Sequence, residues 1–271
     1  MISDITIGQY FPSKSIIHRL DPRLKICLVI YFIVLIFCSK NFLNLGICII
    51  SIIAFMYLSK VPMKIYVKSL KPIFFIVAFT SLINLFYGTG DPLISFWLFN
   101  ITLNGIFNSI LIAFRIVSLI LISSVLTFCT SPTQLTDAIE RLLKPLAYLK
   151  VPVHDFAMMM TIALRFVPTL LEETDKIMSA QKARGADMES GGIMQRVKAL
   201  IPVLIPLFVS AFRRAFDLAT AMESRCYTGG KGRTKMKILK FGKDDVLALV
   251  FSVAFLGIFI PLNLILPQIV R

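Results

Sequence analysis

Long apolar stretches recur along the chain and are separated by short basic or polar segments. A helix needs about 20 mostly apolar residues to cross the roughly 30 Å of hydrocarbon in a bilayer. Backbone groups in lipid must pair within the segment, so each crossing is helical. The pattern predicts about five transmembrane helices, covering residues 26–37, 42–58, 72–86, 106–128 and 246–266.

The number of embedded segments is open at two places. The stretches 156–171 and 201–212 are also apolar, but each contains proline and leads into charged sequence. If the two insert together as a hairpin, seven segments are embedded, and each end of the chain stays on the same side of the membrane as with five. The first predicted span, 26–37, is short and needs Lys40 to reach outward to the membrane surface.

The distribution of lysine and arginine orients these spans. Residues 88–105 contain neither, and the loop between the first two spans contains only Lys40. Because cytoplasmic loops carry the excess of basic residues, we expect a cytoplasmic N-terminus in the cell membrane and an external Arg271. The basic residues that decide this are Lys14, Arg19, Arg23, Lys25, Lys60, Lys64, Lys68 and Lys71.

This topology predicts an all-α, polytopic membrane protein in three parts. Residues 1–128 form an N-terminal transmembrane region of about four helices. Residues 129–245 form a cytoplasmic helical domain, and residues 246–271 form a C-terminal transmembrane helix.

The composition supports a membrane protein. Hydrophobic residues make up 57% of the 271 residues, and charged residues only 16%, against about a quarter in soluble domains. A net charge of +14 would suggest nucleic acid in a soluble protein, but here it fits loops that face anionic lipid, so no nucleic acid is expected. Five scattered cysteines and two histidines lack the spacing of a zinc site, so we expect neither a metal nor another cofactor.

A helix is predicted to start at Ser131. Ser131 is a capping residue, Pro132 suits the first helical position, and Gln134 completes a capping box. Apolar residues then recur at helical spacing in a helix of about four turns that ends near Pro145. This amphipathic helix suits a membrane surface or a groove between helices, and equally the surface of a bundle.

Two longer helices are predicted at residues 154–184 and 193–227, with the turn 190–192 between them. Pro168 in the first, and Pro202 and Pro206 in the second, are expected to kink them. Three consecutive methionines, 158–160, lie early in the first helix and are read as ordinary packing more readily than as a binding surface.

Each long helix ends with one arginine between small residues. The first ends in Ala183, Arg184 and Gly185, and the second in Ser224, Arg225 and Cys226. Arginine at a helix C-terminus followed by glycine is ordinary helix-end chemistry. Two such ends on consecutive helices also suit a pair of docking points, since a guanidinium binds a partner's carboxylate bidentately.

These features resemble the T component of energy-coupling factor transporters, which are ABC-type importers of vitamins and metal ions. The resemblance rests on the two arginine motifs, on the stretch 227–234, and on the opening His18-Arg19-Leu20-Asp21-Pro22-Arg23-Leu24-Lys25. The second motif departs from the Ala-Arg-Gly pattern at both flanks but keeps its arginine.

The resemblance implies a function for the chain. A T component is a non-catalytic subunit that links ATP hydrolysis by two partner ATPases to uptake of a micronutrient captured by a separate S component. The cytoplasmic domain would then be a coupling domain. Residues Ala183, Arg184, Gly185, Ser224, Arg225 and Cys226 would dock the ATPases, and the surface of the coupling helices would seat the S component. Consistent with this, the sequence has no phosphate-binding loop of its own.

Two other functions remain open. The first is a dedicated subunit for cobalt or nickel import, paired with one S component. A membrane-embedded enzyme would need a convergent catalytic set, for which only His18 with Asp21 and His154 with Asp155 are candidates. The sequence does not indicate which vitamin or ion is moved.

Arg115 is the one basic residue inside a predicted span, where an arginine costs roughly 2.5–3.5 kcal/mol to insert. We expect Asn84, Asn104 or Asn108 to pair with it, or a protein-covered face to hold it. A structural role and a functional role are both consistent with its position.

Overall fold

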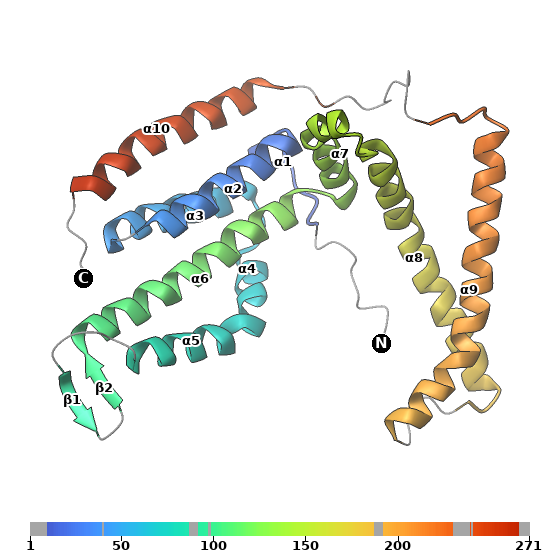
Figure 1. Ribbon diagram of the computed structural model, residues 1–271, viewed down its shortest axis with the longest axis horizontal. Helices are drawn as coiled ribbons and strands as arrows, with labels where there is room; N and C mark the ends of the chain where they lie inside the picture. The colour runs from blue at the N-terminus through green and yellow to red at the C-terminus, as the bar shows by residue number, and fades with distance from the viewer. Residues whose placement is uncertain are drawn as a thin grey trace. The chain divides into compact units, whose positions relative to one another are not determined.

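The computed structural model describes residues 10–39, 41–86, 92–96, 99–186, 192–229, 239 and 241–265. Helices dominate this part of the chain, joined by one short antiparallel strand pair with Phe96 opposite Phe99 (Figure 1). The elements are α1 (Ile16–Arg19), α2 (Pro22–Cys38), α3 (Phe42–Ser59), α4 (Met63–Leu70), η1 (Lys71–Ile73), α5 (Phe74–Phe86), β1 (Pro92–Phe96), β2 (Phe99–Thr102), α6 (Leu103–Cys129), α7 (Pro132–Leu142), η2 (Lys144–Leu149), α8 (Val153–Ala183), α9 (Ile193–Glu223) and α10 (Lys243–Ile265).

Local sequence explains where several helices begin and end. Asp21 caps α2 by accepting a hydrogen bond from Arg23 N at 2.9 Å, and Pro22 takes the first helical position. Thr102 caps α6 through Gly105 N at 3.0 Å. Lys60 ends α3 with a left-handed backbone.

The chain forms two compact units. The bundle unit comprises residues 8–138 and 238–271, and the α8–α9 unit comprises residues 139–237 with 1–7. The three-part division predicted from the sequence separates transmembrane from cytoplasmic segments. The two compact units do not test it, so it stays a prediction.

The core of the bundle unit lies where α2, α3 and α6 meet. Helix α6 packs against α2, α3, α4 and α5, and α10 packs against α3. Phe32 on α2 contacts the rings of Phe55 on α3 and Phe255 on α10, at centroid distances of 5.3 and 5.5 Å. The most buried side chains include Phe32, Ile36, Leu45, Cys48, Ile52, Tyr66 and Phe128.

Serines join α5 to α6. The hydroxyls of Ser81 and Ser109 lie 2.6 Å apart, and Ser109 Oγ also donates to Ser81 O at 2.7 Å. In lipid there is no hydrophobic drive for helices to associate, so small residues and hydrogen bonds of this kind hold them together. Apart from Thr80 and Asn84, the rest of α5 is apolar. No residue of α5 is buried within the structure, as expected of a helix that faces lipid or a membrane partner.

The expectation of a helical membrane protein with about five spans is confirmed. By length and composition, five described helical segments are able to cross a membrane: Phe42–Ser59, Met63–Phe86, Leu103–Cys129, Met194–Glu223 and Lys243–Ile265. They are not the same five that the sequence suggested. The first predicted span lies in the 17-residue α2, which is outside this set, and the ambiguous stretch 201–212 lies in α9, which is inside it.

Arg115 is held by a partner that the sequence did not suggest. Its Nη2 donates to the carbonyl oxygen of Ser39 at 2.7 Å. Ser39 is the C-cap of α2. Carbonyl groups at this end of a helix have no N–H donor inside the helix, and the helix dipole is negative there. This contact gives Arg115 a structural role: it satisfies the end of a neighbouring helix.

Candidate functional site

The first arginine motif closes α8 with a Schellman turn. Ala186 N donates to Gln181 O at 3.0 Å, and Gly185 N donates to Lys182 O at 3.0 Å. Gly185 adopts φ +83°, the left-handed conformation that this turn requires. Arg184 is therefore the last residue before the chain reverses, and it is exposed.

The second motif closes α9 in the same way. Tyr227 N donates to Met222 O at 3.0 Å, and Cys226 N donates to Glu223 O at 2.8 Å. Cys226 adopts φ +54° and so takes the place that Gly185 has in the first motif. Arg225 again directly precedes the left-handed residue, and it is exposed.

The two motifs are thus one backbone device used twice. In each, the small first residue, the arginine and the left-handed third residue are all exposed, as a docking surface requires: Ala183, Arg184 and Gly185, and Ser224, Arg225 and Cys226. The sequence difference at the third position does not change the turn.

Helices α8 and α9 run antiparallel. Glu173 on α8 contacts Arg214 on α9, and Met158, earlier on α8, accepts a hydrogen bond from the hydroxyl of Tyr227, later in the chain, at 3.0 Å. The two arginine motifs therefore lie at opposite ends of the helix pair. Figure 1 shows the two helices crossing.

Helix boundaries in this unit differ modestly from those predicted. Helix α9 ends at Glu223, four residues before the predicted end, and α7 has 11 residues, about three turns at 3.6 residues per turn rather than four. Both long helices continue through their prolines. Residues 190–191 and 230–234, part of the predicted turn and of the stretch 227–234, lie outside the described residues.

The histidines have structural partners. His18 Nε2 donates to Phe11 O at 2.9 Å, and its Nδ1 lies 2.7 Å from Ser15 Oγ. Burial lowers the pKa of His18, and the positive charge of Lys25 acts in the same direction, so the neutral ring is favoured. His154 Nδ1 lies 3.0 Å from Glu140 Oε1.

The opening segment ties the bundle unit together. Asp245, at the start of α10, accepts hydrogen bonds from Asp21 N and Gly242 N, both at 2.7 Å. Arg23 Nη2 donates to Leu239 O at 3.2 Å. These contacts join the start of α2 to the start of α10. They give a structural role to Asp21 and Arg23 in the opening stretch on which the resemblance partly rests.

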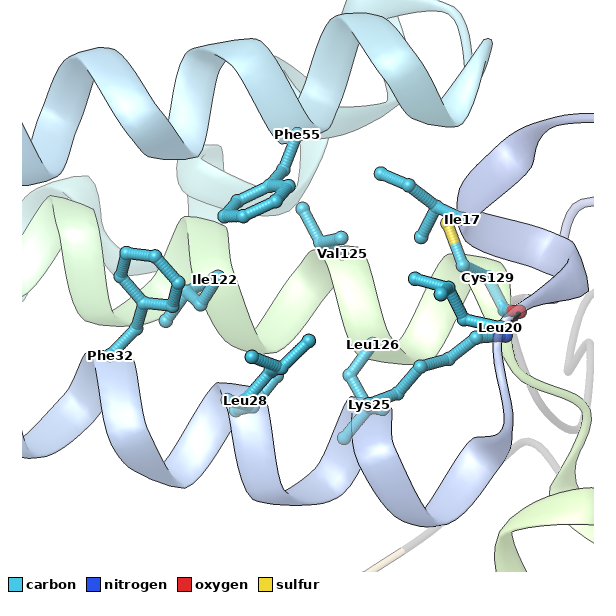
Figure 2. Close-up of a pocket in the computed structure, with 11 residues that line it drawn as sticks. Ile17, Leu20, Lys25, Leu28, Phe32, Phe55, Ile122, Val125, Leu126 and Cys129 are labelled. Carbon is cyan, nitrogen blue, oxygen red and sulfur yellow. Dashed lines mark hydrogen bonds between the residues drawn. The ribbon is translucent and has the colours of Figure 1, made fainter. Parts of the chain in front are cut away.

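A small cavity beside this segment is a packing feature. It is lined almost entirely by apolar side chains of α1, α2, α3 and α6, and Lys25 is the charged residue among them (Figure 2). Figure 2 shows the Lys25 side chain running along the cavity toward Cys129, and its Nζ donates to Cys129 O at 3.0 Å and to His18 O at 3.3 Å. The ammonium group therefore donates to two backbone carbonyls. No group of three or more metal-ligating side chains occurs among the described residues.

Sequence reasoning missed the polar contact between α8 and α9. Glu173 accepts a hydrogen bond from Ser210, and Arg214 Nη2 lies 2.6 Å from its second carboxylate oxygen. The sequence offered no clear signal, because Arg214 is only one of several charged residues in α9, beside Arg196, Lys198, Arg213, Asp217 and Glu223. The partner of Arg214 lies 41 residues away and is fixed only by the fold.

Comparison with known proteins gives a consistent result. A family model described as CbiQ, cobalt transport protein, matches residues 13–236. The energy-coupling factor transporter transmembrane protein EcfT of Ruminiclostridium cellulolyticum is 51% identical over 256 residues, which cover 94% of this chain and 96% of that protein. The EcfT proteins of Acidaminococcus fermentans and Bacillus subtilis are 49% and 45% identical, over 96% and 94% of this chain and 100% and 98% of their own lengths.

The matched region includes both arginine motifs and most of both units. The relatives are matched over nearly their whole lengths, so the similarity concerns the complete membrane subunit. The chain therefore belongs to the family of energy-coupling factor transporter transmembrane proteins, and is a T component of such a transporter.

Proposed function

We propose that this chain couples ATP hydrolysis by two ABC-type ATPase subunits to the uptake of a vitamin or other micronutrient captured by a separate S component. Arg184 and Arg225 each dock one ATPase. The observation that carries the proposal is the repeated turn, which presents a single exposed arginine at the end of each long helix.

The geometry suits two partners. Because α8 and α9 are antiparallel, their C-termini point in opposite directions, and two ATPases can each receive one helix end. A guanidinium at such an end has a planar set of donors for a carboxylate in a partner's groove. Small neighbours let the groove close around it.

The chain is a multi-pass membrane protein, and we further propose that its N-terminus is cytoplasmic. The proposal rests on the basic residues that flank the predicted spans. It places the ends of α8 and α9 on the side where ATP is hydrolysed. The division into 1–128, 129–245 and 246–271 follows from the same orientation.

A narrower function is a dedicated cobalt or nickel importer, which the description of the family model favours. The EcfT names of the relatives favour the general energy-coupling factor module instead. The two are separated by the number of different S components that copurify with the chain: one for a dedicated importer, several for a shared module.

Uptake by variants tests the coupling function. An S component of known vitamin specificity is coexpressed with this chain and the ATPases, and that vitamin is supplied radiolabelled. Truncating one partner of a buried charge pair costs roughly 2–5 kcal/mol, so Arg184→Ala and Arg225→Ala should each reduce uptake sharply. Lysine at either site should restore it only in part, because an ammonium lacks the planar fork.

The neighbouring charge Lys182 supplies the control, because it lies on the same helix end outside the motif. Lys182→Ala should leave uptake close to that of the parent. Normal uptake by the two arginine variants, or equal damage from Lys182→Ala, would show that the docking assignment is wrong.

A further inference from the structure

One carboxylate on α8 holds two side chains on α9, away from both arginine motifs. Ser210 Oγ donates to Glu173 Oε1, and Arg214 Nη2 lies 2.6 Å from Glu173 Oε2. All three side chains are partly buried. Ser210 and Arg214 are four residues apart, so they stack on one face of α9. Because each oxygen of Glu173 is engaged by a different turn of α9, the contact opposes sliding of one helix along the other.

The position of this contact relative to the motifs is symmetric. Glu173 lies eleven residues before Arg184, and Arg214 lies eleven residues before Arg225. Eleven residues make about three turns, or about 16 Å along the axis, which returns a side chain to nearly the same face. Since the helices are antiparallel, the two arginines lie equally far from the contact in opposite directions.

We propose that Glu173, Ser210 and Arg214 form a register pin that sets the relative position of the two arginine-bearing helix ends. With the register fixed, a displacement of one end by its ATPase is passed to the other end, and the helix pair moves as one body. These are positioning residues, acting through Arg184 and Arg225. The inference rests on the proposed function, because it assigns the two ends to two ATPases.

The register pin is tested in the assembled complex, with this chain, its ATPases and an S component of known vitamin specificity in liposomes. ATPase retention, ATP hydrolysis and uptake of the radiolabelled vitamin are measured together. Glu173→Gln and Arg214→Gln should retain the ATPases and keep hydrolysis within about twofold of the parent. Vitamin transported per ATP should fall at least tenfold.

Exchange of the two charges and two neighbouring residues supply the controls. Glu173→Arg combined with Arg214→Glu should recover at least half of the parental transport per ATP, since the pair is restored in reverse. Glu172→Gln and Arg213→Gln change exposed charges next to the register pin and should have no effect. Parental coupling in Glu173→Gln, or equal losses in the two controls, would overturn the inference.

A cross-linking experiment keeps the test independent of variant stability. In a chain carrying Glu173→Cys and Ser210→Cys, a short bifunctional thiosulfonate should join α8 to α9 and raise transport per ATP, and reduction should reverse the gain. A loss of transport on cross-linking would mean that the helices must slide, which contradicts the register pin. If the parent chain itself retains no ATPase, the proposed function fails, and that result is distinct from parental coupling in the variants.

Discussion

At the scale of residues, the two motifs differ most in their third member. Gly185 and Cys226 both hold left-handed backbones, yet only glycine does so without a steric penalty. No atom outside its chain neighbours lies within 4 Å of a β-carbon built on Gly185, so backbone conformation and not space restricts that position. The second motif therefore carries conformational strain that the first does not.

Cys226→Gly should relieve this strain and stabilise the chain by roughly 1 kcal/mol, while ATPase binding is kept. Gly185→Ala should destabilise it by a similar amount, roughly 1–2 kcal/mol. Thermal unfolding of the purified chain in detergent measures both. A lower midpoint for Cys226→Gly would show that the thiol side chain itself contributes to the end of α9.

Residue-level prediction succeeded where the signal was local. The sequence located both arginines at helix ends because capping depends on a few adjacent residues. It did not find the partner of Arg115 or the pairing of Glu173 with Arg214, since each joins positions far apart in the chain. Such partners are set by tertiary packing, which a single sequence does not show.

At the scale of elements, the predicted capping box at the start of α7 is confirmed. Gln134 N donates to Ser131 Oγ, and Ser131 N donates to Gln134 Oε1, both at 3.3 Å. The end of the helix was predicted less well. It stops at Leu142, before Pro145, and a 3₁₀ segment carries the chain onward from Lys144.

Ser131→Ala should cost on the order of 1 kcal/mol, because it removes the acceptor for one free helix N–H. We expect weaker assembly of the complex and normal insertion into the membrane. Ser131→Thr is the matched control, because it keeps a hydroxyl acceptor at the cap. If the Ser131→Ala complex withstands heating as well as the parent complex, the cap has no part in assembly.

At the scale of the whole molecule, the sequence predicted the class and the approximate number of spans from hydrophobic length alone. It could not decide which marginal segments cross, because α2 is short and α9 mixes charges with apolar runs. Pattern counting also gave no hint of the β1–β2 pair, which is too short to show an alternation. The side of the membrane on which each loop lies was inferred only from the distribution of basic residues, so the orientation calls for a direct test.

Labelling of introduced cysteines tests the orientation. In a chain without its native cysteines, an impermeant maleimide added to intact cells should label a cysteine at Thr89 and miss one at Ser13. Thr89 lies outside the described residues, and Ser13 is described. Labelling at Ser13 with protection at Thr89 would invert the topology and remove α8 and α9 from the side where ATP is hydrolysed.

Retention of the ATPases is the most direct test of the central claim that two matched arginine ends dock two ATPases. The tagged chain is purified after coexpression with both ATPases, and the bound ATPase is quantified for the parent, for Arg184→Ala with Arg225→Ala, and for Lys182→Ala. A loss of 2–5 kcal/mol at each contact corresponds to roughly a thirtyfold or greater loss of affinity. The account predicts both ATPases on the parent and on Lys182→Ala, and neither on the double variant. Parental amounts of both ATPases on the double variant would contradict it.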